Sequence, residues 1–502
     1  MTATTSANSS LWLDTAPAAT YPVLAGDLSV DVAVVGGGIT GLTTALLLRR
    51  AGATVAVLEA AAIGSGVTGC TTAKVSALQA TLYTTIGKHH DPATVAAYAQ
   101  ASMAGVEQVA ALAAEESIDC DLARRDAITY AAIPDERAAL EAEADAVRRA
   151  GLPIEFVETA DLPLPTHGAI QLADQLQIHP VRYTQGLAAA LTIENRDSYV
   201  FENTRVVGVE EGKPCRVRTL RGFVTAEHVV IATHYPILDR GLYFARLAPQ
   251  RSYCIAARPA AGPLPSGMAI NAGRPTRSVR SSAELIIIGG EGHPTGASDA
   301  TPERFARLEQ FARQHWNIES VTHRWSAQDP VSYDHLPFIG PYRPGASRLW
   351  VAAGFMKWGL ATATFAAQLL TDRINGRPGQ WADTFSPNRI SPRSLPRAAQ
   401  LGAKVGGDLI GDRLRLLKPA DAEDVAAGRA RIVRDRRSPT GVYRDPDGRL
   451  HAVSARCPHM GCLLRFNHAE TSWDCPCHGS RFDVDGQLLE GPAVDSLEQG
   501  RP

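Results

Sequence analysis

Four cysteines and two histidines near the C-terminus form the group of side chains best suited to binding metal. They lie in two short stretches, Cys457-Pro-His459-Met-Gly461-Cys462 and Cys475-Pro-Cys477-His478-Gly479-Ser480. A Cys-x-His pair followed by a Cys-x-x-His pair offers two thiolates and two imidazoles, with two thiols to spare. Such a set suits an iron–sulfur centre. A structural zinc site, which also takes mixed Cys and His ligands but needs only four of them, is the alternative.

Both stretches resemble the boxes C-x-H-x-G-C and C-P-C-H-G-S of Rieske proteins of the cytochrome bc and b6f type. The resemblance implies that Cys457 and Cys475 bind one iron of a [2Fe–2S] cluster, while His459 and His478 bind the other. Two His ligands in place of two Cys raise the reduction potential of such a cluster. The resemblance therefore favours the cluster over zinc.

This ligand assignment leaves Cys462 and Cys477 unused, and we interpret them as a disulfide that ties the two cluster loops together. Ser480 stands where the family has a hydroxyl that donates to a cluster sulfur, a bond that tunes the potential. Phe482 stands where high-potential members carry Tyr, so one donor is absent. Residues 491–493, Gly-Pro-Ala, resemble the third loop that covers the cluster in this family.

A glycine-rich turn near the N-terminus joins a predicted strand, residues 30–35, to a predicted helix, residues 42–50. Its first glycine permits a tight turn, its third lets the backbone approach a pyrophosphate, and its last allows the helix to pack closely on the strand. A second predicted strand, residues 54–58, ends in an acid that can accept hydrogen bonds from ribose hydroxyls. The alternative is a glycine-rich turn without a ligand. The pattern predicts a dinucleotide site with these cofactor-binding residues: Gly36, Gly38, Ile39, Thr40, Gly41 and Glu59.

Residues 11–377 resemble the D-amino-acid-oxidase-like flavoproteins, which include sarcosine oxidase, glycine oxidase and γ-glutamylputrescine oxidase, and most closely the subgroup with a C-terminal Rieske domain. The resemblance makes FAD the expected cofactor. It also implies further FAD-binding residues in a loop after Glu59, in the strand that contacts adenine, and beside the isoalloxazine ring: Thr71, Thr72, Ala73, Val206, Gly354, Lys357 and Gly359. A helix that begins near Gly359 would stabilise negative charge on reduced flavin. His234 replaces the glycine of the family's Ala-Thr-Gly turn, which puts the geometry of that turn in question.

The expected architecture is an α/β Rossmann-like FAD-binding domain, an α+β substrate domain with a mixed or antiparallel sheet, and a small all-β Rieske domain. We assign residues 28–90, 165–238 and 330–380 to the FAD-binding domain, and residues 91–164 and 239–329 to the substrate domain. Residues 381–416 are expected to be a linker, because residues 387–407 are rich in Pro, Ser, Arg and Gly. Residues 417–502 form the expected Rieske domain, with short predicted strands before the cluster loops.

Polar residues in the expected substrate sheet and after it are candidates for the substrate pocket: Arg251, Tyr253, His293, Tyr333, His335 and Lys357. Of these, we select Tyr253, His335 and Lys357 as candidate catalytic residues, although each alone is more often a packing or surface residue. The covalent-flavin cysteine of sarcosine oxidases has no equivalent around residues 329–337. We therefore expect FAD to bind without a covalent bond.

Composition and the N-terminal sequence indicate which partners and which cellular location to expect. A net charge of −2 gives no reason to expect nucleic acid or an anionic membrane as a partner. The four cysteines outside the boxes have no regular spacing and are expected to be reduced thiols of a cytoplasmic protein. The chain starts without the features of a secretory signal, and no apolar run approaches the ~20 residues of a membrane helix.

The sequence predicts an FAD-dependent dehydrogenase that oxidises a C–N bond of a small amine or amino acid and exchanges electrons with an external one-electron carrier through the cluster. One alternative is an oxidase in which dioxygen reoxidises the flavin and the cluster only modulates it. Another is a redox sensor whose partner binding depends on the cluster. A ring-hydroxylating oxygenase is disfavoured, because it needs a mononuclear iron site downstream of the cluster and only 24 residues follow His478.

Overall fold

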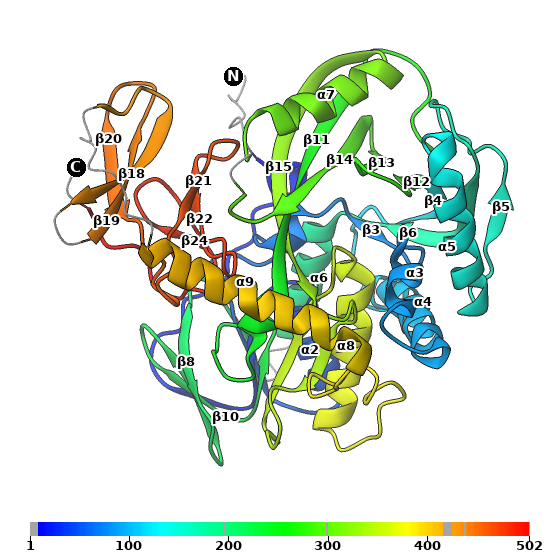
Figure 1. The fold of residues 1–502 in the computed structure, drawn as a ribbon. Helices are drawn as coiled ribbons and strands as arrows, with labels where there is room; N and C mark the ends of the chain where they lie inside the picture. The colour runs from blue at the N-terminus through cyan, green and yellow to red at the C-terminus, as the bar shows by residue number, and fades with distance from the viewer. Residues whose placement is uncertain (1–8, 194–196, 298–299, 415–423, 436–437, 501–502) are drawn as a thin grey trace.

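The computed structural model describes the chain except residues 1–8, 194–196, 298–299, 415–423, 436–437 and 501–502 (Figure 1). Two large sheets and a group of helices form the first three-quarters of the chain. The Rieske part, coloured orange to red in Figure 1, lies beside both sheets. Among the described helices, none contains a segment long and apolar enough to cross a membrane.

The first sheet carries the glycine-rich turn. Its strands in spatial order are β16 (Phe338–Pro341), β17 (Leu349–Ala353), β10 (Phe223–Ile231), β1 (Leu28–Val35), β2 (Val55–Leu58) and β7 (Ser198–Phe201), and β8 (Val206–Glu210) and β9 (Cys215–Thr219) extend from β10. The strands from β17 to β7 are parallel. Because both faces of β1 are covered, its residues 32–35 are apolar without interruption: Val32 and Val34 join one buried cluster, and Ala33 and Val35 join another.

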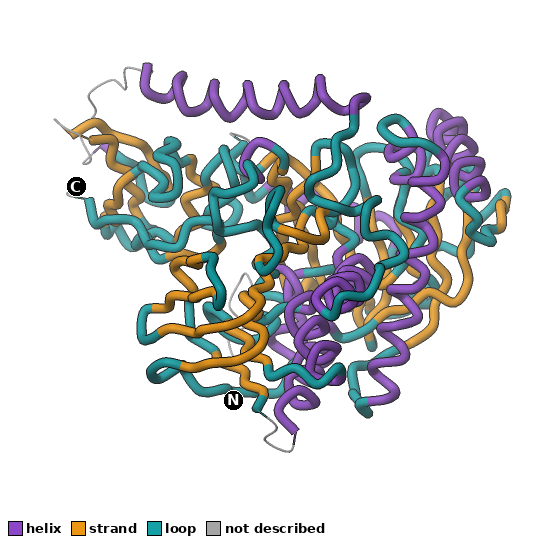
Figure 2. Tube along the Cα trace, turned by 90° about the horizontal axis from the view of Figure 1, so that it is seen from below, coloured by secondary structure: helices purple, strands orange, loops and turns teal. Residues whose placement is uncertain are grey.

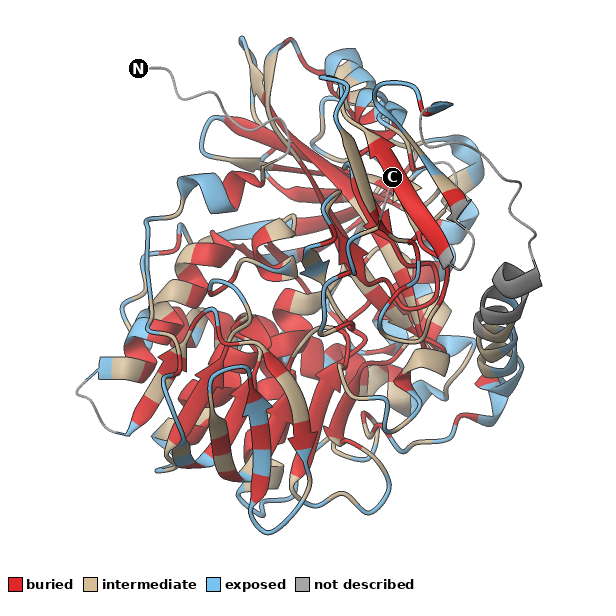
Figure 3. Cartoon of the chain, turned by 90° about the vertical axis from the view of Figure 1, so that its left-hand side faces the viewer, coloured by how far each residue is buried: buried red, intermediate tan, exposed pale blue. Residues whose placement is uncertain are grey.

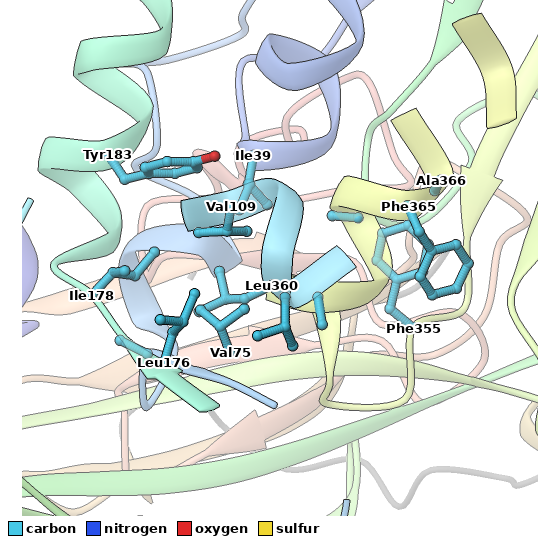
Figure 4. Close-up of a cluster of buried hydrophobic side chains, with 14 of the residues drawn as sticks. Ile39, Val75, Val109, Leu176, Ile178, Tyr183, Phe355, Leu360, Phe365 and Ala366 are labelled. Carbon is cyan, nitrogen blue, oxygen red and sulfur yellow. The ribbon is translucent and has the colours of Figure 1, made fainter. Parts of the chain in front are cut away.

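Helices cover one face of this sheet. They are α2 (Ile39–Arg50), α6 (Pro180–Thr192) and α8 (Gly359–Ile374), and α4 (Pro92–Glu115) packs against α8. Ile39, Val109, Leu360 and Phe365 from three of these helices lie together in the core (Figure 4). Burial is concentrated in the sheets and in these enclosed helices (Figure 3). Smaller helices complete this part of the chain: α1 (Leu11–Thr15), α3 (Leu82–Gly87), α5 (Arg137–Arg149) and α7 (Glu303–His315).

The second sheet belongs to the expected substrate domain and is mixed. Its strands in spatial order are β15 (Ile318–Ser332), β11 (Leu247–Pro259), β14 (Leu285–Pro294), β13 (Arg277–Ser282), β12 (Met268–Asn271), β4 (Ala123–Tyr130), β6 (Ala169–Gln177) and β3 (Lys74–Val75), with β5 (Glu155–Val157) on β6. The long strand β11 pairs in antiparallel fashion with both β14 and β15. Side chains along β11 therefore alternate between two opposite environments.

The Rieske part consists of two antiparallel sheets. They contain β18 (Arg429–Asp435), β19 (Ser438–Arg444) and β20 (Leu450–Ser454), then β21 (Arg465–Asn467), β22 (Ser472–Asp474), β23 (Arg481–Phe482) and β24 (Leu488–Glu490). The interval expected to be a linker holds a helix, α9 (Leu395–Leu414). This helix runs along the outside of the molecule toward the Rieske part (Figures 1 and 2), with Ala398 and Leu401 packed against the core of the first sheet. The glycines and prolines of the interval hid this helical segment in the sequence.

Candidate functional site

The glycine-rich turn has the geometry that the sequence predicts. Gly36 has φ +111°, and a Cβ there would lie 2.6 Å from the carbonyl oxygen of Ala232. A Cβ on Gly41 would lie 1.9 Å from the carbonyl oxygen of Gly36. Gly36 excludes a side chain because the segment after β10 lies against it, and Gly41 excludes one because the start of α2 presses on the end of β1.

Glu59 ends β2 and orients the same turn. Its carboxylate accepts hydrogen bonds from the backbone N–H groups of Gly37 (2.6 Å) and Ala61 (2.9 Å). Burial raises the pKa of Glu59, although these two bonds and the nearby Arg205 oppose the increase. The side chain is thereby held at the mouth of the cleft that follows the turn.

A single cleft runs from this turn toward the second sheet. Most of the expected cofactor residues line it: Gly36, Gly38, Ile39, Thr40, Glu59, Thr71, Val206, Lys357 and Gly359. Gly41, Thr72, Ala73 and Gly354 do not line the cleft. The sequence analysis missed Thr68, Arg205, Gln328 and Asp329, which also line it. Thr68 and Arg205 are close in sequence to the predicted FAD-binding residues Thr71 and Val206. Gln328 and Asp329 lie in no motif that predicts cofactor binding.

Charged and polar side chains gather near the second sheet at one part of this cleft. Lys357, in a left-handed conformation with φ +77°, donates a hydrogen bond to Ser252 Oγ. Burial lowers the pKa of Lys357, and the nearby Asp329 partly offsets this effect. Burial raises the pKa of Asp329, with His234 and Lys357 acting in the opposite direction. A lysine and a carboxylate that perturb each other in a cleft are typical of a functional site.

His234, which replaces the glycine of the turn after β10, adopts the backbone conformation that a glycine would adopt there. Its φ of +64° lies in the left-handed region that glycine favours, and its Nε2 lies 2.6 Å from the carbonyl oxygen of Gln328. Histidine is among the residues that adopt this conformation more often than most. His234 can therefore occupy this position of the turn without a glycine.

Two of the three candidate catalytic residues lie outside the cleft. Tyr253 points to the face of β11 opposite Ser252, where its hydroxyl lies 3.1 Å from His293 Nε2 within an apolar cluster. His335 stacks on His89 and is in contact with Arg397 of α9. Burial, together with Arg397, lowers the pKa of His335 to about 3. Strand alternation turns Tyr253 away from the cleft, and the docking of α9 does the same for His335, so neither lies beside Lys357 there.

Two other pocket candidates also have different roles. Tyr333 packs in the core of the first sheet, stacked on Phe338. Arg251 points away from the cleft and pairs with Glu470 and Glu490 of the Rieske part. Of the candidate substrate-pocket residues, Lys357 alone lines the cleft.

The four expected metal ligands converge in the Rieske part. The Nδ1 atoms of His459 and His478 lie 3.2 Å apart, and the thiols of Cys457 and Cys475 are within hydrogen-bonding reach of each other. All except His459 are buried, with relative exposures of 2% or less. Two thiols and two ring nitrogens facing one another fit a Rieske [2Fe–2S] cluster, which takes this donor set.

A disulfide joins Cys462 and Cys477, as predicted. It is buried against the ligand Cys475, whose Sγ lies within 4.8 Å of both disulfide sulfurs. Ser480 is in contact with the thiol of Cys457, and its hydroxyl accepts a hydrogen bond from the Ala493 backbone N–H (3.0 Å). The third loop is therefore fastened directly to the second cluster loop.

The cluster loops lie against the FAD cleft. His478 has no exposed surface and packs against Tyr235 and Phe244, with ring centroids 6.3 and 5.8 Å away. His459 Nε2 lies 2.7 Å from the carboxylate of Asp239, at a second groove. Gly491 and Ala493 of the third loop line the FAD cleft itself, together with the residues on either side of the loop, Leu489, Glu490 and Val494. One cavity is thus bounded by the glycine-rich turn and by the loop that covers the cluster.

Comparison with known proteins agrees with this geometry. The profile of the family "FAD dependent oxidoreductase" matches residues 31–373, and that of the "Rieske [2Fe-2S] domain" matches residues 416–500. YhfW of Bacillus subtilis, assigned as a Rieske 2Fe-2S iron-sulfur protein, is 32% identical over 97% of this chain and 96% of its own length.

Solved structures share the fold of the first three-quarters of the chain. Glycine oxidase from Geobacillus kaustophilus matches with a TM-score of 0.62 and 21% identity, covering 72% of this chain and 99% of that one. L-Proline dehydrogenase from P. horikoshii matches with a TM-score of 0.61 and 19% identity, covering 73% and 98%. The chain therefore belongs to the D-amino-acid-oxidase-like family of FAD-dependent oxidoreductases and carries a C-terminal Rieske domain that binds a [2Fe–2S] cluster.

Proposed function

We propose that this oxidoreductase is a dehydrogenase that oxidises the C–N bond of a small amine or amino acid and delivers electrons to an external one-electron acceptor. When bound, FAD supplies hydride acceptance from a C–H bond next to nitrogen, and the cluster supplies one-electron transfer. The observation that carries the proposal is the shared cavity, in which the loop over the cluster forms part of the wall of the FAD cleft.

The chain's own residues support this assignment at two points. Gly38, Glu59 and Thr68 line the part of the cleft suited to the pyrophosphate and ribose, where the N-terminus of α2 has no side-chain cap at Gly38. Gly359, which begins α8, lines the same cleft near Lys357, so a second helix N-terminus favours negative charge there.

Lys357 is the residue we assign to the substrate. The Lys357 ammonium lies in the cleft near Asp329 and Ser252, where it can hold a carboxylate or a polar group of an amine substrate. Its lowered pKa also allows it to exchange a proton, a property that burial confers on lysine. L-Proline dehydrogenase and glycine oxidase share this fold, and their names refer to amino acids.

Anaerobic mixing with a panel of D-amino acids, N-methyl amino acids and polyamines tests the proposal. Bleaching of the flavin followed by cluster reduction supports it. Rapid peroxide formation in air without cluster turnover would identify an oxidase instead. Failure of every compound to bleach the flavin would favour a sensor. A Lys357→Met variant should weaken binding of the active compound while retaining FAD absorbance.

A further inference from the structure

Arg251 of β11 is a buried cation that belongs to the interface between the substrate sheet and the Rieske domain. Its side chain is 1% exposed, and it pairs with two Rieske carboxylates, Glu470 at 2.5 Å and Glu490 at 3.3 Å. Ser326, on the neighbouring strand β15, also donates a hydrogen bond to Glu470. A buried arginine that depends on a separate domain for its counter-charges is costly to leave unpaired.

The Rieske side of this interface is an acidic cluster, defined as Glu470, Asp474 and Glu490 around Arg481. Arg481 pairs with all three carboxylates, at 3.0, 3.0 and 3.2 Å. Within the Rieske domain, one cation therefore faces three carboxylates, and Arg251 of the substrate sheet supplies a second cation. Burial alone would raise the pKa of Glu470, but Arg251 and Arg481 lower it to about 2. The acidic cluster is thus charged and is completed by a residue from the other domain.

Close backbone contacts surround this ionic cluster. A Cβ on Gly296 would lie 2.8 Å from Cα of Pro476, which lies between Cys475 and Cys477. Gln328 Nε2 donates to the carbonyl oxygen of Gly479 (2.9 Å), and the backbone N–H of His468 donates to the carbonyl oxygen of Ala300 (3.0 Å). The two domains therefore meet with specific, desolvated contacts immediately beside the cluster ligands.

We propose that the Rieske domain is held in a fixed docked position on the FAD cleft, and that Arg251 is the positioning residue that holds it there. Glu490 belongs both to the acidic cluster and to the cleft wall, so the ionic contact directly places the loop over the cluster. Any role of this docking in electron transfer rests on the proposed function, whereas the docking itself is independent of that function.

Hydrogen exchange on the full-length holoprotein tests the proposal without a substrate. The His468 amide bonds across the interface, so its exchange reports opening between the domains. Breaking a buried ion pair by removing one partner should raise the open population by roughly a hundredfold or more. In Arg251→Met we expect this increase at His468, while the amides of β21 and β22, paired within the Rieske domain, keep their wild-type rates.

A matched control comes from the same strand. Arg258 forms an exposed pair with Glu284 (2.7 Å), with side-chain exposures of 42% and 84%, so Arg258→Met should leave His468 exchange unchanged. Unchanged exchange in Arg251→Met, or the same increase in both variants, would overturn the proposal.

If Arg251→Met unfolds the Rieske domain, substitutions at two glycines test the fixed docking instead. Gly296 and Gly345 have φ of +72° and +79°, but only Gly296 faces Pro476, whereas nothing lies within 4 Å of a Cβ on Gly345. Gly296→Asn should accelerate exchange at His468 and Gly345→Asn should not. Equal rates in the two variants would contradict fixed docking. A substrate panel that finds no reaction would leave this exchange result intact, so the two proposals fail separately.

Discussion

Removing the Cys462–Cys477 disulfide should leave a cluster that forms but is lost quickly. The two cysteines are separated by 15 residues, and the disulfide packs against the ligand Cys475. For a loop of this length, chain entropy gives a stabilisation of about 3 kcal/mol. If local opening of the cluster loops governs loss of the cluster, that energy corresponds to a roughly hundredfold faster loss, because 1.4 kcal/mol is tenfold.

The assay follows cluster absorbance and EPR in the Cys462→Ser/Cys477→Ser double variant, at fixed temperature with an iron chelator present. FAD absorbance in the same sample reports whether the rest of the chain stays folded. A double variant at the buried free thiols Cys120 and Cys215 is the control and should keep the wild-type half-life. An unchanged half-life in the disulfide variant would refute the reasoning. So would mass spectrometry that finds both thiols free in the native protein.

Three further predictions concern the FAD cleft, a buried histidine and the cluster ligands. Gly38 has an ordinary φ of −84°, so Gly38→Val adds no backbone strain. The valine side chain would enter the cleft near Thr68 and should yield colourless, FAD-free protein. Glu59→Gln should weaken FAD binding less, since an amide can still accept a hydrogen bond from a ribose hydroxyl. His179 caps α6, and burial lowers its pKa from 6.5 to about 4. As the pH falls, His179 is therefore protonated in the unfolded chain before it is protonated in the folded protein, so the stability of the fold should decrease between pH 6.5 and pH 4. In His179→Asn, which keeps a capping acceptor, the fall in melting temperature over this range should be smaller. His459→Ala should abolish the Rieske EPR signal while FAD stays bound.

The sequence was sufficient for features encoded by local spacing. The two ligand boxes, the disulfide pair and the turn from Gly36 to Gly41 each lie within a short stretch whose chemistry depends on few residues. Strand alternation explains why Arg251 and Tyr253 do not line the FAD cleft, although the sequence makes both candidates for the substrate pocket. Period-two alternation places these two residues on one face of β11 and Ser252 on the other, but it does not say which face meets the FAD cleft.

The interface was hidden because its contacts are distant in sequence. Arg251 and Glu470 are separated by 219 residues, and neither stands in a motif. The third loop could be recognised as a cover for the cluster, yet its second role as a wall of the FAD cleft arises only from docking of the domains. Helix α9 was missed because glycines and prolines in its segment oppose helix formation, while packing of Ala398 and Leu401 supports it.

Light-driven reduction of bound FAD, with EDTA as the electron donor and no substrate, tests the central claim most directly. Under anaerobic conditions the account predicts that flavin bleaching is followed by the EPR signal of a reduced Rieske cluster. The FAD-free Gly38→Val variant, illuminated identically, should give no such signal. Complete flavin bleaching with a cluster that stays oxidised would contradict the account, as would purified protein that contains zinc in place of iron and sulfide.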